Sequence, residues 1–261
     1  MADFADTVRV AASDRYFASL YAPAERRADL HVLYAFDAEI AAIRDKVSTP
    51  MLGEFRLQWW RDALENGEGG GNPLAESLID VMRRHDLPVR ALLDLLEARV
   101  FDLYDDPFPT WNDLEGYAGE TRGRISMLAS AILAPQAPRT GPIADAAGHG
   151  AIASLLRDVL LHLPTNAARG QLYLPADTIA AYDANASELA SQPISSALQE
   201  ELRDRTAAHL SASFAALRDL PAAARPAFLP LTTIATDLAK ARPAATWRRL
   251  WVMRAAARKG F

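Results

Sequence analysis

One stretch near the middle of the chain shows apolar residues at the spacing of an α-helix, interrupted by charged or titratable side chains. Arg157, Asp158 and His162 interrupt it, and the last two project from one helix face because they lie four residues apart. A charge on a buried helix costs free energy unless it is paired. The stretch therefore predicts a helix deep in a bundle that forms one wall of a polar pocket. Its apolar stripe consists of Ile152, Leu155, Leu156, Val159, Leu160 and Leu163.

Helical spacing of apolar residues recurs along the chain, and no stretch alternates strictly for long enough to predict a strand. Half of the 261 residues are apolar, which is enough for a sizeable core. We expect one all-α domain over residues 1–261, a bundle of about ten to twelve helices in which helices 23–47 and 140–163 line a central cavity. The other expected helices span 5–20, 51–65, 74–85, 88–104, 110–133, 193–220, 226–240 and 244–259, with a short one after Pro175.

Local signals predict where several helices begin and end. Pro164 disfavours continuation of the central helix because proline has no N–H donor and clashes with the preceding turn. Residues 183–192 indicate a polar connection. Thr110 is an expected N-cap, and Asp113 follows three residues later, as in a loose capping box.

Composition excludes several classes of function. The chain has no cysteine, so it forms no disulfide, thiolate metal site or cysteine nucleophile. Its net charge of −5 speaks against a nucleic-acid partner. No window of about eighteen apolar residues predicts a membrane span. The first residues, with Asp3 and Asp6, match neither a signal peptide nor a transit peptide, so we expect a cytoplasmic protein.

The C-terminal segment 240–261 differs in composition from the rest of the chain. It has no acidic residue, and Trp247 and Trp251 lie among its basic residues. A basic amphipathic helix with tryptophans is typical of a helix at an anionic membrane surface. Alternatively, the aromatic side chains pack on the bundle and the arginines are solvated. The basic residues are Lys240, Arg242, Arg248, Arg249, Arg254, Arg258 and Lys259.

Three motifs together resemble those of the squalene/phytoene synthase family. RRADLHVLYAFDAEIAAIRDKV (26–47) resembles the first aspartate-rich helix of that family, and LQWWRDALE (57–65) resembles its Trp-Arg helix. LLRDVLLHLPTNAARGQLYLPAD (155–177) resembles its second aspartate-rich helix and the Tyr-Leu-Pro that follows. The order and spacing match over nearly the whole chain, so the resemblance implies a helical bundle with the isoprenoid synthase fold.

In that family, carboxylates four residues apart on two facing helices hold Mg²⁺ against a diphosphate leaving group. The resemblance places one such pair at positions 41 and 45 and the other at positions 158 and 162. Here these residues are Ala41, Asp45, Asp158 and His162, so each pair has lost one carboxylate. Other positions also depart from the family pattern: Ala38, Ala42, Ala151, Ser154, Leu161 and Gln171.

The remaining polar residues of these motifs are the candidate site. Asp45, Asp158 and His162 are the remnant catalytic candidates, and Asp45 and Asp158 are the only candidate metal ligands, because histidine suits Mg²⁺ poorly. A transition-metal site at Asp158 and His162 lacks an evident third ligand. We therefore expect no metal or cofactor, with Mg²⁺ only in an active enzyme. Alternatively, Asp158 pairs with Arg157 or Arg169, His162 is a hydrogen-bonded core residue, and Asp45 pairs with Arg44 or another arginine. The candidate ligand-binding residues are Tyr34, Arg44, Asp45, Arg157, Asp158, His162, Arg169 and Tyr173.

Two functional hypotheses follow from the resemblance. Within the family, this loss of carboxylates resembles the pattern of a divergent, non-catalytic branch. That branch includes a mitochondrial assembly factor for respiratory complex I. This implies a respiratory complex subunit or assembly partner, an isoprenoid or lipid ligand, and contact with a membrane surface through the C-terminal helix. Without a transit peptide, the chain fits a bacterial counterpart of that factor, cytoplasmic and peripheral on the inner membrane. The alternative is an active head-to-head prenyl synthase that joins farnesyl or geranylgeranyl diphosphates. An unrelated lipid-binding role is a third reading.

Overall fold

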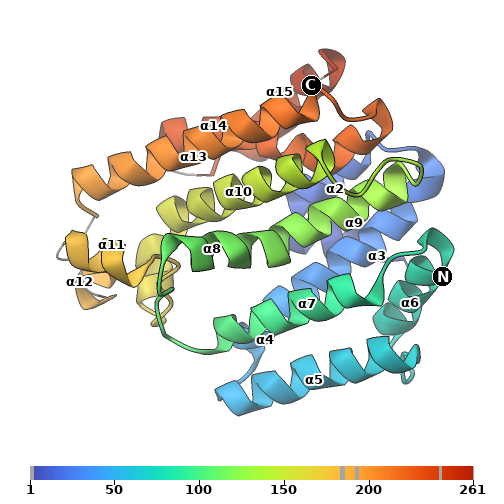
Figure 1. The fold of residues 1–261 in the computed structure, drawn as a ribbon, viewed down its shortest axis with the longest axis horizontal. Coiled ribbons are helices and arrows are strands. Elements are labelled where there is room, and N and C mark those ends of the chain that lie inside the picture. Colours follow the sequence, from blue (N-terminus) through green and yellow to red (C-terminus); the bar gives the residue numbers. More distant parts are fainter. Residues whose placement is uncertain (1–2, 183–185, 192–193, 241–242, 261) are drawn as a thin grey trace.

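A computed structural model of the chain describes residues 3–182, 186–191, 194–240 and 243–260. The described residues form an all-α bundle, and the only β-type pairing among them is an isolated bridge between Phe108 and Pro175. Figure 1 shows α10 running through the bundle, with α13 on one side and α8 and α9 on the other. No helix among the described residues is long and apolar enough to cross a membrane.

The N-terminal part of the chain forms helices close to the expected ranges. One difference lies in the expected helix 23–47, which is interrupted at Ala42. The buried face of α3 includes Leu30, Leu33 and Phe36, which explains the apolar spacing seen in the sequence. The helices are α1 (Ala5–Ala11), α2 (Ser13–Ser19), α3 (Ala24–Ala41), α4 (Ile43–Lys46), α5 (Pro50–Asn66), α6 (Pro73–His85) and α7 (Val89–Arg99), followed by a 3₁₀ turn, η1 (Val100–Leu103).

The expected helix 110–133 is one helical run with a π-helical turn in its middle. The run consists of α8 (Trp111–Ala118), the π turn η2 (Gly119–Gly123) and α9 (Arg124–Leu133). Thr110 caps it as expected: its hydroxyl accepts from the Asp113 N–H, and the Asp113 carboxylate accepts from the Thr110 N–H. Periodicity alone does not show a π turn, since it adds only one residue to one turn.

The central helix α10 (Pro142–Ala167) is longer than expected, so the prediction that Pro164 ends it was wrong. Proline removes one hydrogen-bond donor, but the last turn is completed beyond it, where the Ala168 N–H donates to the Pro164 carbonyl. α10 packs along α13 (Ser196–Leu217) for much of its length. Five of the six residues of its predicted apolar stripe are buried, and the sixth, Leu160, is half-buried.

The C-terminal part departs most from the expected element types. Part of the expected polar connection 183–192 is helical, while residues 183–185 and 192–193 lie outside the described residues. The expected helix 226–240 begins as a 3₁₀ helix, because Pro226 and Pro230 remove donors that an α-helix needs. The elements are α11 (Ala176–Ala181), α12 (Ala186–Ser191), the 3₁₀ helix η3 (Ala222–Thr233), α14 (Ile234–Lys240) and α15 (Thr246–Arg258).

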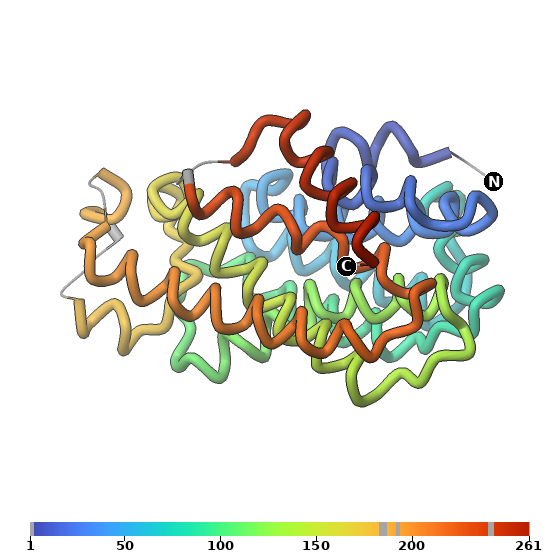
Figure 2. Tube along the Cα trace, turned by 90° about the horizontal axis from the view of Figure 1, so that it is seen from above, coloured from blue at the N-terminus to red at the C-terminus, as the bar shows by residue number. Residues whose placement is uncertain are grey.

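The C-terminal helix α15 packs beside the N-terminal helix α2. Figure 2 shows α15 next to the N-terminal helices, and α15 contacts both α2 and η3. Met253 of α15 is fully buried against Ala18 and Leu229. The expected C-terminal helix 244–259 is therefore confirmed, and one of its faces is part of the core.

Candidate functional site

A cavity of about 430 Å³ lies between the two helices that the sequence predicted to line one. Asp37, Ala38 and Ala41 of α3 contribute to its wall. α10 contributes the segment from Gly150 to Asp158 on the other side. The junction of α1 and α2, the end of α7, the π turn, α9, η3 and α15 complete the lining. The cavity is polar, which agrees with the prediction that a buried charged helix would border a polar pocket.

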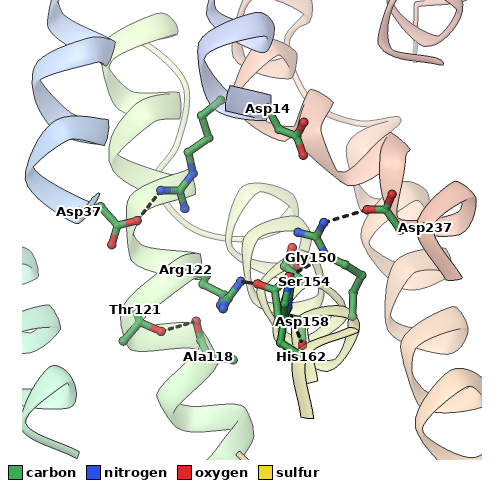
Figure 3. Close-up of polar contacts among 12 residues, drawn as sticks. Asp14, Asp37, Ala118, Thr121, Arg122, Gly150, Ser154, Asp158, His162 and Asp237 are labelled. Atoms are coloured by element: carbon green, nitrogen blue, oxygen red, sulfur yellow. Dashed lines mark hydrogen bonds and ion pairs between the residues drawn. The ribbon is translucent and has the colours of Figure 1, made fainter. Parts of the chain in front are cut away.

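A chain of ion pairs crosses the cavity between α10 and the C-terminal helices. Asp158 contacts both Arg122, at 2.6 Å, and Arg157, at 2.9 Å. Arg157 also contacts Asp237 of α14 at 2.9 Å, and Asp237 is fully buried. Arg249 of α15 donates to Asp237 as well, so Asp237 receives two guanidinium groups. Figure 3 shows Arg122 on Asp158 and the contact to Asp237.

A second chain of ion pairs lines the side of the cavity formed by α2, α3 and α7. Arg15 donates to one oxygen of Asp37, and Arg99 lies 3.2 Å from the other. Arg99 also contacts Asp102 at 3.0 Å. Asp14, the neighbour of Arg15 in the sequence, links this chain of ion pairs to the first. The Asp14 carboxylate contacts Arg249 at 2.6 Å.

We call these ten residues the arginine–aspartate network. Its members are Asp14, Arg15, Asp37, Arg99, Asp102, Arg122, Arg157, Asp158, Asp237 and Arg249. Five are arginines and five are aspartates, so the formal charges cancel within the network. Buried charges that are paired in this way avoid most of the cost of leaving water. The cavity wall therefore has no surplus carboxylate to neutralise a metal ion.

The surroundings keep the central carboxyl groups ionised. Burial acts to raise the pKa of Asp158, but Arg122 and Arg157 outweigh it and hold the pKa below its ordinary value. Asp37 has a lowered pKa for the same reason, with arginines opposing the effect of burial. Asp14 differs, because burial raises its pKa in spite of Arg249, and one of its oxygens is buried without a hydrogen-bond partner.

Only two of the eight predicted ligand-binding residues, Arg157 and Asp158, line this cavity. Asp45 forms an ion pair with Arg169 at 3.0 Å, where both side chains are more than half exposed. Arg44 lies beside them and contacts Asp105 at 2.6 Å. The two aspartates of the motifs thus take part in different contacts, and Asp45 is not in the cavity wall.

The other predicted residues are also directed elsewhere. His162 is exposed, and its Nδ1 lies 3.1 Å from the backbone oxygen of Asp158 rather than from its carboxylate. Tyr34 is buried beneath Arg15, and burial raises its pKa to about 12. The hydroxyl of Tyr173 donates to Asp102 at 2.9 Å, next to the hydroxyl of Tyr117 on the same oxygen.

Sequence reasoning missed most of the network. The candidate set did not contain Asp14, Arg15, Asp37, Arg99, Asp102, Arg122, Asp237 or Arg249. Isolated charges inside apolar runs were the available signal for some of them: Asp37 interrupts LYAFDAEI, and Asp237 interrupts a helical run between Ile234 and Leu238. Arg249 carried no such signal, because it lies among other basic residues.

The carboxylates present do not fit a Mg²⁺ site of the kind that the resemblance implies. Within the described ranges, no group of three or more histidine or acidic side chains is placed to hold a metal ion. Asp158 is already occupied by Arg122 and Arg157, and Asp45 by Arg169. Mg²⁺ prefers near-octahedral oxygen ligands, and guanidinium groups compete for those oxygens. Arginines therefore engage the two aspartates that the motifs retain.

An all-α bundle around one central cavity defines this chain as a protein with the isoprenoid synthase fold. A dehydrosqualene synthase in complex with ligand has the same fold, with a TM-score of 0.80 over 98% of this chain and 94% of that chain. A squalene synthase of Alicyclobacillus acidocaldarius gives 0.72 over 98% and 92%. The sequence identities are 15% and 17%, so these likenesses show the fold alone.

The chain belongs to the squalene/phytoene synthase family, whose model matches residues 8–254. Complex I assembly factor 6 (NADH dehydrogenase (ubiquinone)) of Mus musculus is 28% identical to it over 233 residues, which are 87% of this chain and 69% of that protein. The phytoene synthase of Mycobacterium bovis is 25% identical over 171 residues, or 66% of this chain and 56% of that enzyme. The predicted family and fold are thus confirmed.

Proposed function

We propose that this chain is a non-catalytic member of its family that acts in respiratory complex I assembly, or binds an isoprenoid or lipid ligand, at a membrane. The observation that carries the proposal is the pairing of Asp158 with two arginines, Arg122 and Arg157, inside a charge-balanced network. On this proposal the carboxylate that an active relative would use for a metal has a structural partner instead. The protein needs no metal or other cofactor.

The chemistry of prenyl transfer supports a loss of activity. Ionising a diphosphate with two or three Mg²⁺ ions requires several carboxylates that hold the ions in fixed geometry. Of the four anchor positions, only Asp45 and Asp158 remain acidic, and each has an arginine partner. Removing one electrostatic donor from an active site commonly costs a factor of about 10²–10³ in rate. Two losses on two helices therefore suffice to abolish useful turnover.

Similarity to a complex I assembly factor supports the role in assembly. The likeness to the mouse factor extends over 87% of this chain, whereas the likeness to the mycobacterial phytoene synthase extends over 66%. The implied partner is a subunit or assembly factor of a respiratory complex. Co-purification of the tagged protein with such subunits tests this role. If a change at the network residue Asp237 abolishes the interaction, the interaction depends on the intact fold.

Turnover can be tested directly. The purified chain is incubated with farnesyl or geranylgeranyl diphosphate and Mg²⁺, and pyrophosphate release and lipid products are measured. We expect no release above the rate without protein. Mg²⁺-dependent release of pyrophosphate with a coupled hydrocarbon product, abolished by Asp158→Ala, would overturn the proposal and establish the alternative of an active head-to-head prenyl synthase.

The proposed membrane contact rests on the outer face of α15. Trp247 and Trp251 are 71% and 68% exposed, so these two side chains do not pack on the bundle. Arg254, Arg258 and Lys259 are exposed on the same helix, and no carboxylate among the described residues pairs with them. The predicted Arg242 lies outside the described residues. Tryptophan and basic residues on one face suit an anionic bilayer, and each such charge contributes about 1 kcal/mol near the surface.

Co-sedimentation with liposomes of anionic and of neutral lipids tests this contact. Deleting the helix is unsuitable, because Met253 and Arg249 belong to the core and the network. Instead, Arg254→Gln with Arg258→Gln should weaken binding to anionic liposomes at low salt, and high salt should remove the difference. A matched control is Arg56→Gln with Arg203→Gln, two exposed arginines outside α15. Equal binding by both double variants would show that α15 is not the contact.

A further inference from the structure

A second pocket, of about 230 Å³, lies on the side of α9 that faces away from the central cavity. Arg122 of the π turn and Ser126 of α9 line the central cavity, whereas Met127, Leu128 and Ala131 of α9 line the second pocket. These two sets of residues lie on opposite sides of the helix. The second pocket is therefore separate from the site described above, and nothing in the proposed function uses it.

The wall of this pocket is almost entirely apolar and is built from small residues. Ala91 at the start of α7 and Ala134 and Ala137 of the connection after α9 leave space that larger side chains would fill. Ile143 of α10 and Pro88 close the remaining sides. An apolar cavity of about 150 Å³ in another protein stays dry and binds benzene, so 230 Å³ of similar character accommodates a larger apolar group.

The polar side chains in the lining are two arginines, and the lining itself contains no acidic residue. Arg139 donates to the backbone oxygens of Asp86, at 2.9 Å, and His85, at 3.4 Å, at the end of α6. No carboxylate of the described part of the chain forms an ion pair with Arg139. Arg124 does contact Glu120 and, at 3.7 Å, Asp94, but its Nε is buried without an acceptor.

We propose that this pocket binds an amphiphile with one medium-length alkyl chain and a single anionic head group. The alkyl chain would occupy the apolar space beside Met127, Leu128 and Ala131. The head group would contact Arg139, whose charge is not neutralised by a carboxylate, and charge-assisted hydrogen bonds of this kind are about twice as strong as neutral ones. A carboxylate and a phosphate head group share this chemistry, so a fatty acid and an alkyl phosphate are the two sources to distinguish.

Calorimetric titration of the full chain with decanoate, decyl phosphate, decanol and acetate tests the proposal, each below the concentration at which it forms micelles. We expect one molecule of decanoate or decyl phosphate to bind per chain. Decanol, without the charge, should bind about tenfold more weakly, and acetate, without the alkyl chain, should not bind measurably. The tighter of the two anions identifies the head-group class.

Variants locate the binding. Arg139→Gln should weaken binding of the anions about tenfold and leave decanol unchanged. Ala131→Leu should abolish binding of all three alkyl compounds because it fills the pocket, and Arg56→Gln is the control for loss of a surface arginine. If circular dichroism shows that Ala131→Leu is unfolded, Ala137→Leu, in the connection after α9, replaces it. Absence of binding to the unmodified chain, or binding that is unchanged in Arg139→Gln and in the filled variant, would overturn the proposal.

Discussion

Replacing Asp237 by alanine should destabilise the protein more than any change at its surface. Asp237 is fully buried and accepts from Arg157, from Arg249 and from the backbone N–H of Ala244 at 2.8 Å. Removing one partner of a buried ion pair costs about 3–5 kcal/mol, because the other charge stays buried and unpaired. Since Arg157 keeps Asp158 and Arg249 keeps Asp14, we expect the lower value, about 3 kcal/mol.

The free energy of unfolding from urea titration measures this loss, and it should correspond to a fall of about 6–12 °C in Tm. Asp204→Ala is the matched control, because Asp204 is exposed on α13 and should change the stability by no more than about 0.5 kcal/mol. Asp237→Asn removes the charge but keeps an acceptor for Ala244, so its loss should be smaller than that of Asp237→Ala. A loss below about 1 kcal/mol for Asp237→Ala would refute the view that the network is a buried structural element.

Three further predictions concern single residues. Burial lowers the pKa of His209 below its ordinary value of about 6.5, so the unfolded chain binds more protons than the folded chain just below that pH. The free energy of unfolding should therefore fall as the pH drops from 7 to 5.5. It should fall less steeply in His209→Gln. Burial raises the pKa of Tyr34 to about 12, so its hydroxyl should stay protonated near pH 10. Ultraviolet titration should therefore show the same number of tyrosines ionising near pH 10 in the unmodified chain and in Tyr34→Phe. A side chain at Gly150 would meet Leu231 at 2.7 Å, so Gly150→Val should cost about 1–3 kcal/mol in urea titration, and no cost would show that α10 and η3 separate freely.

The fold could be predicted because its signals are local. Ile152, Leu155, Leu156 and Val159 recur within two helical turns, and burial of such a stripe is what orders a bundle. Element ends were less predictable, as Pro164 shows, because the backbone hydrogen bonds continue past it and Ala167 is buried in the core.

The site could be predicted only in part because its contacts join distant residues. Asp158 and Arg157 were found, since both interrupt the central stripe. Their partners Arg122 and Asp237 lie 36 residues from Asp158 and 80 residues from Arg157, and no spacing rule connects such positions. Asp45 was selected through the motif alone, and the structure places it in an exposed ion pair instead of the cavity.

The contact between Asp14 and Arg249 joins positions 235 residues apart, and it has a consequence for how the chain is made. Until Arg249 has been synthesised, Asp14 and Asp237 lack one of their cations, and the cavity wall lacks the side chain that α15 contributes. Contacts between distant positions also form slowly, because a long loop must close first. A chain without α15 would therefore leave Asp14 without Arg249 and Asp237 with Arg157 alone, and it would expose the apolar site that Met253 covers.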